Sequence, residues 1–401
     1  MKIQKENPAR AFAMIAKTIR GAEDVAAAEL RALGASKVET QSCAVKFVGG
    51  KYLLYKANLW SRTAMRILAP VRDFCVEDKD ELYREAGRVN WSRFMDADGT
   101  LAVDAFINNS AFDNSVFVAQ RVKDAIVDQF RSRTGRRPNV DLKNPGLRVN
   151  IYIEGKRAIL SLDSSGEPLF RRGYRTESGE APINEVLAAC IIALSQWDGR
   201  TLFIDPMCGS GTFVIEAALL ARRKATGLLR RSFGFMRWRD YDGEIFERVC
   251  SEAADAALPH SSATIIGSDI SPERIKEAVA NARRAGVERD ICFECAAFEE
   301  RTPPPSPGTL IMNPPYGNRV KVEDAEAFYR KIGDTLKNKY DGFNAFIFTN
   351  NALAAKAVGL RTSRRIPLFN GSLECRLLKY EMYQGTRKVK NMEPGKLNSG
   401  L

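Results

Sequence analysis

Histidine is nearly absent from this 401-residue chain, in which His260 is the only one. A site built from this sequence therefore has little access to imidazole, the commonest metal ligand and a frequent general base. Cysteine does not fill this gap. The eight cysteines are scattered, and the single C-x-x-C pair, Cys292 and Cys295, has no further ligands at metal-binding spacing. The sequence predicts neither metal catalysis nor histidine acid–base chemistry.

Long hydrophobic runs are also missing. The longest uncharged apolar run, Val186–Trp197, is shorter than the roughly 20 residues that a membrane-spanning helix needs. The N-terminal apolar run from Ala11 to Ile19 contains Lys17 and lacks the small-residue cleavage site of a secretory signal. The sequence therefore predicts a cytoplasmic protein that binds no membrane, and the scattered cysteines fit reduced thiols.

Positive charge is abundant. The chain has 61 Lys and Arg against 49 Asp and Glu, for a formal net charge of +12. Phosphate backbones are the commonest partner of such a protein. The most basic segment is an expected helix over 115–133, which carries Arg121, Lys123, Arg131 and Arg133 and runs into Arg136 and Arg137. This segment is either a solvated helix face or a phosphate-contacting surface, and the residues alone leave both readings open.

Short strands and helices alternate over the first part of the chain, as is typical of small α+β domains. The pattern predicts strands over 12–19, 38–48, 67–76, 101–107, 147–153 and 157–162, and helices over 21–33, 52–60, 80–89 and 115–133. Two modest domains are expected here.

A regular α/β series begins after Phe170-Arg171-Arg172-Gly173-Tyr174-Arg175. The pattern predicts helices over 183–196, 212–225, 272–285 and 325–340, and strands over 201–204, 264–267, 291–295, 309–312 and 344–348, with an irregular segment after residue 225. Strands separated by helices predict a mostly parallel, doubly wound sheet. The basic tail from Arg387 onward is expected to be disordered.

A glycine-rich turn, Asp205-Pro206-Met207-Cys208-Gly209-Ser210-Gly211-Thr212, lies between an expected strand and an expected helix. Its glycines let the backbone approach a ligand closely. A P-loop would need lysine where Thr212 stands, and a dinucleotide site would need a small residue where Val214 stands. A dinucleotide site would also need an acid about 20 residues further on. An S-adenosylmethionine site is the nucleotide-type reading that remains.

Asp269 lies at the end of the next expected strand, in Gly267-Ser268-Asp269-Ile270. A carboxylate there can accept the two hydroxyl groups of a ribose. Asp269 could instead cap the following helix, but Ser271, directly before Pro272, is the better cap candidate. We therefore favour the ligand-binding interpretation.

A proline corner, Asn313-Pro314-Pro315-Tyr316-Gly317, follows the expected strand over 309–312. Two consecutive prolines fix φ and remove two amide donors, so the strand must end in a rigid turn. The turn places an amide side chain, free carbonyl groups and an aromatic ring at the carboxyl edge of the sheet, where open α/β sheets bind ligands. Such a cluster can accept hydrogen bonds from an exocyclic amine and stack on a base, which predicts methylation of an amino group on a nucleobase.

These features together resemble the motifs of Rossmann-like amino-methyltransferases, whose signature is Asp, Asn or Ser followed by Pro-Pro and an aromatic residue. The chain is similar, more closely, to bacterial large-subunit rRNA guanine-N2 methyltransferases of the RlmL type. The stretches that carry this resemblance are Arg172 to Arg175, Ala181-Pro182-Ile183-Asn184-Glu185, Asp205 to Ala218, Arg231-Ser232-Phe233 with Trp238, and Asn313 to Gly317. Residues 66–165, with Asn144-Pro145 before an expected strand, resemble the RNA-binding THUMP module of that family.

The resemblance implies an α/β fold in three domains: a ferredoxin-like N-terminal domain over 1–65, a THUMP domain over 66–165 and a Rossmann-like methyltransferase domain over 166–385. A basic flexible tail would follow over 386–401. It implies S-adenosyl-L-methionine as the cofactor, and RNA as the partner, either 23S rRNA or an assembling large ribosomal subunit. The reaction it implies is methyl transfer to N2 of a guanine.

The same resemblance assigns residues to roles. Those that would carry the transfer are Asn313, Pro314 and Tyr316. Those that would hold the cofactor are Asn184, Asp205, Met207, Cys208, Gly209, Gly211, Thr212, Asp269 and Ile270. One departure stands out: such enzymes often have an acidic residue after the third strand to bind the adenine amine, and here Ala296-Ala297-Phe298 stands there. Adenine recognition would then rest on backbone groups, on Glu299 or Glu300, or on packing by Phe298.

Two other functions fit the same motifs. The Asn-Pro-Pro-Tyr corner serves adenine and guanine amines alike, so an N6-adenine methyltransferase acting on DNA or RNA is the first alternative. A non-catalytic RNA-binding factor with a vestigial cofactor fold is the second, although the intact Asp205, Gly209, Gly211, Asp269 and Asn313 argue against such decay.

Overall fold

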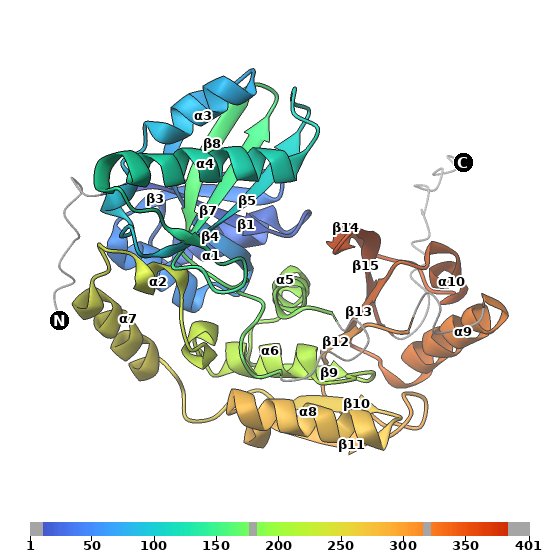
Figure 1. Ribbon diagram of the computed structural model, residues 1–401. Helices are drawn as coiled ribbons and strands as arrows, with labels where there is room; N and C mark the ends of the chain where they lie inside the picture. Colours follow the sequence, from blue (N-terminus) through green and yellow to red (C-terminus); the bar gives the residue numbers. More distant parts are fainter. Residues whose placement is uncertain (1–10, 176–182, 316–321, 384–401) are drawn as a thin grey trace, which may run out of the picture.

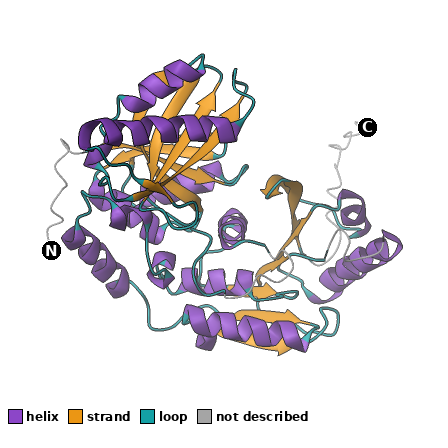
Figure 2. Ribbon diagram, in the orientation of Figure 1, coloured by secondary structure: helices purple, strands orange, loops and turns teal. Residues whose placement is uncertain are grey.

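A computed structural model describes residues 11–175, 183–315 and 322–383 of the chain. Two β-sheets organise these residues, and they form separate layers in Figure 2. In the described ranges, no helix combines the length and the apolar character needed to cross a membrane.

The first sheet has eight strands in the order β2-β3-β1-β4-β8-β7-β5-β6. Its strands are β1 (Phe12–Thr18), β2 (Ser36–Gln41), β3 (Ala44–Gly49), β4 (Ala64–Cys75), β5 (Thr100–Asn108), β6 (Asn139–Val140), β7 (Leu147–Glu154) and β8 (Arg157–Asp163). Its helices are α1 (Glu23–Ala32), α2 (Lys51–Trp60), α3 (Lys79–Gly87), the short η2 (Trp91–Arg93) and α4 (Ser115–Thr134). Figure 1 shows α3 and α4 lying across one face of this sheet.

The expected α+β alternation is confirmed in this half, with one error. The single strand predicted over 38–48 is a hairpin, because the chain reverses at Ser42 and Cys43 between β2 and β3. Cys43 has a left-handed φ of 57°. Gly or Asn usually occupies such a position in a turn, and because Ser42 and Cys43 stand here instead, no signal in the sequence predicted the hairpin. The sheet also runs without a break across the predicted boundary at 65 and 66, because β1 pairs with β4. The exact boundary between two domains in this half stays a prediction.

The second sheet has seven strands in the order β11-β10-β9-β12-β13-β15-β14. Its strands are β9 (Leu202–Asp205), β10 (Ile265–Asp269), β11 (Ile291–Cys295), β12 (Gly308–Met312), β13 (Asn344–Thr349), β14 (Arg364–Asn370) and β15 (Leu373–Glu381). The strands from β11 to β13 pair in parallel, and β15 and β14 complete the sheet antiparallel. The predicted doubly wound sheet is confirmed, while the antiparallel hairpin was not predicted.

The helices of this half are α5 (Glu185–Ser195), α6 (Thr212–Ala221), α7 (Gly243–Asp255), α8 (Pro272–Ala285), α9 (Val322–Lys339) and α10 (Ala352–Ala357), with the short η3 (Thr226–Leu229), η4 (Gly234–Arg237) and η5 (Glu288–Asp290). The prediction of a helix over 212–225 was too long. The chain leaves α6 after Ala221, where Arg62 from the first half donates to the carbonyls of Leu219 (3.0 Å) and Lys224 (2.7 Å).

The segment predicted to be irregular joins the two halves. It contains η3, η4 and α7, so the prediction of an irregular segment was wrong over Gly243–Asp255. Phe233, Phe235, Trp238 and Phe246 belong to the same core cluster as the first sheet. Tyr55 of α2 stacks on Phe235 of η4, with ring centroids 4.3 Å apart, and meets Phe246 of α7 edge-on. This packing fixes the second half of the chain against the first.

Candidate functional site

Three parallel strands end side by side in the second sheet. β9 pairs with β10 on one side and with β12 on the other, with Asp205 opposite Gly267. The strand order reverses here, because β10 and β11 extend to one side of β9 while β12 and β13 extend to the other. Open α/β sheets bind ligands at the carboxyl ends of strands at such a reversal. Asp205 ends β9, Asp269 ends β10 and Asn313 follows β12, so the main predicted residues meet at one edge.

The two glycines of the turn after β9 have different surroundings. Both have left-handed φ, 53° for Gly209 and 87° for Gly211. A Cβ on Gly211 would lie 3.0 Å from the Cβ of Ala278 in α8, whereas a Cβ on Gly209 would meet nothing within 4 Å. Gly211 is therefore required for close packing of the turn on α8, and Gly209 exposes its backbone to open space.

Asp269 is held by the turn that it faces. Its Oδ2 accepts from the Gly209 amide (2.9 Å), and its Oδ1 accepts from the Ser271 amide (3.0 Å). Ser271 caps α8, because its hydroxyl accepts from the Arg274 amide, as predicted. Each carboxylate oxygen of Asp269 keeps further lone pairs, so the side chain is positioned by the fold and can still accept from a ligand.

Asp205 is a buried carboxyl group, with 1% of its surface exposed. Its Oδ1 accepts from the Met207 amide at 3.1 Å. Burial raises the pKa of Asp205 well above its ordinary value, and the nearby Asp269 carboxylate raises it further. Burial likewise raises the pKa of the Cys208 thiol, so Cys208 lacks the thiolate character of a nucleophile. The site holds negative charge poorly until a positive group comes close.

The proline corner carries an unused acceptor. Pro314 is buried and Pro315 is exposed. Among the described residues, the side-chain oxygen of Asn313 has no hydrogen-bond partner although it is buried from solvent. Such a group costs free energy unless something binds it. Tyr316 and Gly317, also predicted here, lie outside the described residues.

Two predicted cofactor residues have structural partners. The Asn184 side-chain oxygen accepts from the Leu187 amide (2.8 Å) and caps α5. The Thr212 hydroxyl accepts from Arg175 and is buried at the start of α6. These contacts explain how α5 and α6 are held beside the turn, and a direct contact with cofactor stays a prediction for both residues.

The residues that could read an adenine ring differ in exposure. Ile270, directly after Asp269, is 74% exposed and presents an apolar surface beside the turn. Phe298 is buried and packs on Tyr340, with ring centroids 5.2 Å apart. The suggested packing of Phe298 on adenine is therefore wrong, since its ring belongs to the core under α9. Glu299 is ion-paired with Lys331.

A residue that the motif analysis missed supports the turn. Asn281 of α8 is buried and donates to the Ser210 carbonyl at 3.0 Å. Arg284 in turn donates to the Asn281 side-chain oxygen at 2.6 Å. The signal in the sequence is an amide residue on the face of α8 that Ala278, Ala282 and Ala285 otherwise fill.

The predicted basic surface on α4 is largely neutralised by the protein itself. Ion pairs join Arg121 to Asp80, Lys123 to Asp124, Arg131 to Asp128 and Arg136 to Asp98. Paired cations attract phosphate less than free ones, so the contacts favour the reading of α4 as a solvated helix face.

The residues at the strand edge fit S-adenosylmethionine. Gly209 leaves room for a ligand, Asp269 keeps acceptor capacity for ribose hydroxyls, and the buried Asp205 carboxyl is favoured as an anion by a nearby cation. The cofactor carries a positive sulfonium and an ammonium group, so its charge complements these two carboxyl groups.

Comparison with known families covers most of the chain. An RMKL-like methyltransferase domain model (UPF0020) matches residues 172–379, a THUMP domain model matches 76–163, and an RlmL ferredoxin-like domain model matches 13–68. The "Ribosomal RNA large subunit methyltransferase K/L" of Syntrophotalea carbinolica is 42% identical over 90% of this chain and 52% of its own length. The "Putative RNA methyltransferase slr0064" of Synechocystis sp. is 39% identical over 93% of this chain and 96% of its own.

Solved structures agree with the fold. SMU.472, described as a putative methyltransferase complexed with SAH, is 30% identical with a TM-score of 0.83, covering 94% of this chain and all of that one. A "possible methylase" from Clostridium difficile 630 is 28% identical with a TM-score of 0.85, over 94% and 100% of the two chains. The chain spans about half the length of the K/L relative it matches. It belongs to the RMKL-like, S-adenosylmethionine-dependent methyltransferase family, with a ferredoxin-like and a THUMP domain preceding the methyltransferase domain.

Proposed function

We propose that this protein transfers a methyl group to the exocyclic N2 amine of a guanine in large-subunit rRNA. The observation that carries the proposal is the buried, unpartnered side-chain oxygen of Asn313 among the described residues, at the edge where Asp205 and Asp269 also end their strands. An acceptor kept in that state is ready for a donor that arrives with the substrate. The THUMP domain and the names of the relatives support RNA as that substrate.

The Asn313 oxygen and the Pro314 carbonyl would hold the substrate amine. An exocyclic amine is a poor nucleophile because its lone pair is delocalised into the ring. Each of the two acceptors can bind one of its N–H groups and favour a more tetrahedral nitrogen. Both also stabilise the positive charge that develops on that nitrogen during transfer. No strong base is needed, which suits a chain with one histidine.

The cofactor residues have separate tasks. When bound, S-adenosylmethionine supplies an activated methyl group. Asp269 would accept the ribose hydroxyls, Gly209 would allow close approach of the backbone, and Asp205 would balance positive charge. Ile270 would pack on the adenine ring, while Met207, Cys208 and Gly211 shape the turn. Tyr316 would stack on the base, which must leave its helix or loop to reach the corner.

Nucleoside analysis tests the proposal. Unmodified large-subunit rRNA transcript, incubated with the protein and S-adenosylmethionine, is digested to nucleosides and analysed by mass spectrometry, with duplex DNA as the parallel substrate. We expect N2-methylguanosine from the RNA. N6-methyladenine would favour the alternative that one solved relative suggests: a 28% identical Listeria monocytogenes protein described as a predicted N6-adenine-specific DNA methylase. No methylation of either substrate would refute the proposal.

A further inference from the structure

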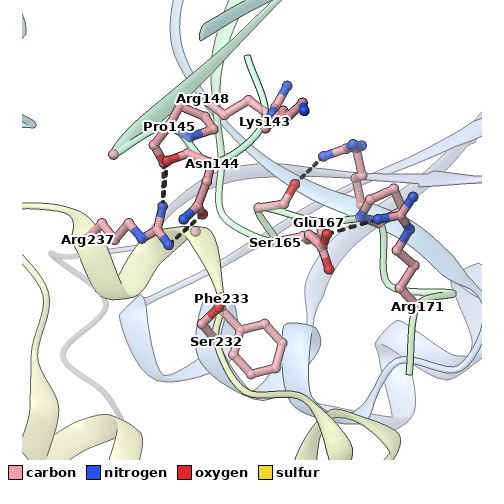
Figure 3. A pocket seen from close by; sticks show the side chains of 15 residues that line it. Lys143, Asn144, Pro145, Arg148, Ser165, Glu167, Arg171, Ser232, Phe233 and Arg237 are labelled. Carbon is pink, nitrogen blue, oxygen red and sulfur yellow. Dashed lines mark hydrogen bonds and ion pairs between the residues drawn. The ribbon is translucent and has the colours of Figure 1, made fainter. Parts of the chain in front are cut away.

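A polar cavity of about 270 Å³ lies away from the strand edge, where the two halves of the chain meet. Three segments and Arg66 of β4 line it, and Figure 3 shows side chains of the three segments converging: 143–148 before and within β7, 165–171 after β8, and 232–237 at η4. Two of these segments contain motifs that carried the family resemblance, Asn144-Pro145 and Arg231-Ser232-Phe233. Neither motif lies at the strand edge, so the methyl-transfer site does not explain the role of either one.

Most of the charged side chains that line this cavity are positive. It is lined by five cationic side chains, Arg66, Lys143, Arg148, Arg171 and Arg237, and by one carboxylate, Glu167. Small-molecule pockets are mostly apolar with a few polar groups, so the lining is unusual for a metabolite and typical of a phosphate site.

Three of the five cations already have carboxylate partners. Arg66 pairs with Asp163, Arg148 with Asp104 and Arg171 with Glu167. The other two, Lys143 and Arg237, have no ion pair with any described residue. Asp141, two residues before Lys143, accepts from the Asn144 and Lys143 amides. With Asp141 added to Asp163, Asp104 and Glu167, four carboxylates stand against five cations, so positive charge remains in excess.

Arg237 is held in place by neutral oxygens. Its guanidinium donates to the carbonyls of Asn144 (3.1 Å) and Pro145 (2.8 Å) and to the Asn144 side-chain oxygen (2.7 Å). These bonds fix the cation between the two halves without neutralising it. Lys143 is adjacent in sequence to the same loop, and its ammonium group makes no hydrogen bond to a described residue.

The cavity does not suit a nucleobase. Phe233 is the single aromatic residue among the described residues that line it. Its ring is buried and stacks on Phe235, with centroids 5.2 Å apart and planes 8° apart, and the guanidinium of Arg230 lies over it. Bases bind proteins by stacking on free rings, and none is free here.

The acceptors of the 165–171 segment are also occupied. Arg230 donates to the carbonyls of Ser165, Glu167, Pro168 and Arg171, at 2.8 to 3.3 Å. An anion entering the cavity would therefore meet donors and cations with few competing free oxygens nearby.

From these observations we infer that the cavity binds a phosphodiester group of the RNA backbone, with Lys143 and Arg237 as its contacts. The inference rests on the proposed RNA substrate and adds where the backbone is held. Phosphate contacts fix the register of a nucleic acid without reading its sequence. A phosphodiester anchored between the THUMP domain and η4 would set which nucleotide reaches the proline corner.

Salt dependence of RNA binding tests the inference. Filter binding of an unmodified large-subunit rRNA transcript is measured at several KCl concentrations for the wild type, Lys143→Gln, Arg237→Gln and Arg136→Gln. Each lost phosphate contact should lower the slope of log Kobs against log salt by about 0.7 to 0.9. We expect this loss for Lys143→Gln and Arg237→Gln. Arg136→Gln is the matched control, because Arg136 is exposed but paired with Asp98, and its slope should stay unchanged.

The outcomes separate this inference from the proposed function. Lys143→Gln removes no contact to a described residue, so it tests the cavity even if Arg237→Gln loosens the junction, which thermal unfolding would reveal. Wild-type salt slopes in both variants, with rRNA still methylated, would overturn the inference about the cavity and leave the proposed function standing. A lower salt slope in Arg136→Gln, with wild-type slopes in the other two variants, would place the phosphate contact just after α4 and would also overturn the inference about the cavity. A wild type that binds no RNA would overturn both proposals.

A competition experiment with inorganic phosphate tests whether the cavity binds a phosphodiester of RNA or a free phosphate ion. Phosphate and chloride are added at equal ionic strength to the wild type and to Lys143→Gln, and RNA binding is measured in each. We expect phosphate to weaken RNA binding by the wild type more than chloride does, and this extra effect to be lost in Lys143→Gln. Phosphate that binds the wild type but not Lys143→Gln in calorimetry, and that leaves RNA binding unchanged, would assign the cavity to free phosphate and overturn its role in RNA binding.

Discussion

Replacing Asn313 by alanine should separate catalysis from stability. In the free protein the Asn313 side-chain oxygen is buried and accepts no hydrogen bond from a described residue. A buried, unsatisfied acceptor costs about 1 to 3 kcal/mol, so its removal relieves a penalty that partly offsets the lost packing. We expect the free energy of unfolding of Asn313→Ala to lie within about 1 kcal/mol of the wild type, as measured by urea denaturation.

The expected loss of activity is much larger. The Asn313 oxygen would gain strength as an acceptor only when positive charge develops on the substrate nitrogen. Loss of one such preorganised contact costs about 3 kcal/mol, or about 10² to 10³ in rate. An interaction made mainly in the transition state lowers kcat and kcat/KM by the same factor. The KM for RNA and the affinity for S-adenosylhomocysteine should therefore change little.

The assay is transfer of a tritiated methyl group from S-adenosylmethionine to unmodified rRNA transcript, with S-adenosylhomocysteine binding followed by calorimetry. Asn313→Asp is the matched variant, because it keeps an acceptor of similar size at the same position and should retain more activity than Asn313→Ala. Near-wild-type turnover in Asn313→Ala would refute the assignment. A protein that unfolds easily and loses the cofactor would show that Asn313 is structural.

Three further predictions concern the turn and the junction. Gly209→Ala should lose only the roughly 1 kcal/mol that a left-handed φ costs alanine, and it should bind S-adenosylhomocysteine at least about tenfold more weakly. Gly211→Ala has the same strain and should lose about 1 to 3 kcal/mol more to crowding against α8; calorimetry and urea denaturation would show the reverse pattern if the two roles were exchanged. Because burial raises the pKa of Asp205, the folded protein holds a proton that the unfolded chain has released. The contribution of Asp205 to stability is therefore complete below the ordinary carboxyl pKa and is lost as pH rises through the raised one, by at most about 1.4 kcal/mol per pH unit. Over this range the wild type should lose more stability than Asp205→Asn; an equal change in the two proteins would contradict this. Arg172→Met leaves Glu216 buried without its cation at 3.5 Å, with the Tyr174 hydroxyl (3.2 Å) as its remaining donor. This variant should cost about 3 to 5 kcal/mol in urea denaturation, with partial recovery on adding Glu216→Leu; no loss would show that the ion pair is dispensable.

Local chemistry explains what the sequence could predict at the site. Backbone geometry constrains each of the three motifs: the glycines after one strand, the acid at the end of the next, and the two prolines after a third. Because the strands are parallel, all three motifs lie at one edge of the sheet. The structure places Asp205, Asp269 and Asn313 at the ends of three adjacent strands, as expected. The cap at Ser271 was predictable for the same reason, since capping depends on neighbours three residues apart.

Tertiary partners explain what could not be predicted. Phe298 follows a strand, and its aromatic ring could face a ligand at that position. The ring instead packs on Tyr340, more than forty residues later in the chain. The early end of α6 depends on Arg62, which lies in the other half. Over 226–238, η3 and η4 are short and the aromatic residues pack into the core of the first sheet, so no local period marks them. Such contacts are between residues far apart in sequence, and no local pattern records them. The helix α7 was missed for a different reason, since Phe246, Val249 and Ala253 do follow a helical spacing that the prediction overlooked.

A buried cation, Arg172, connects the first half of the chain to the helix that follows the glycine turn. The Arg172 guanidinium donates to the Arg62 carbonyl (2.7 Å) and to the Leu169 carbonyl (2.8 Å), and it lies 3.5 Å from Glu216 of α6. The helix that carries Glu216 begins at Thr212, directly after the glycine turn. A charge buried on all sides tolerates little displacement, since moving it leaves donors or the carboxylate unpaired. Arg172 therefore helps to hold α6, and with it the start of the glycine turn, against the first half of the chain. The inferred phosphate contact needs such a junction, because an RNA held at the cavity can present a defined nucleotide to the proline corner only if the two halves keep their relative positions.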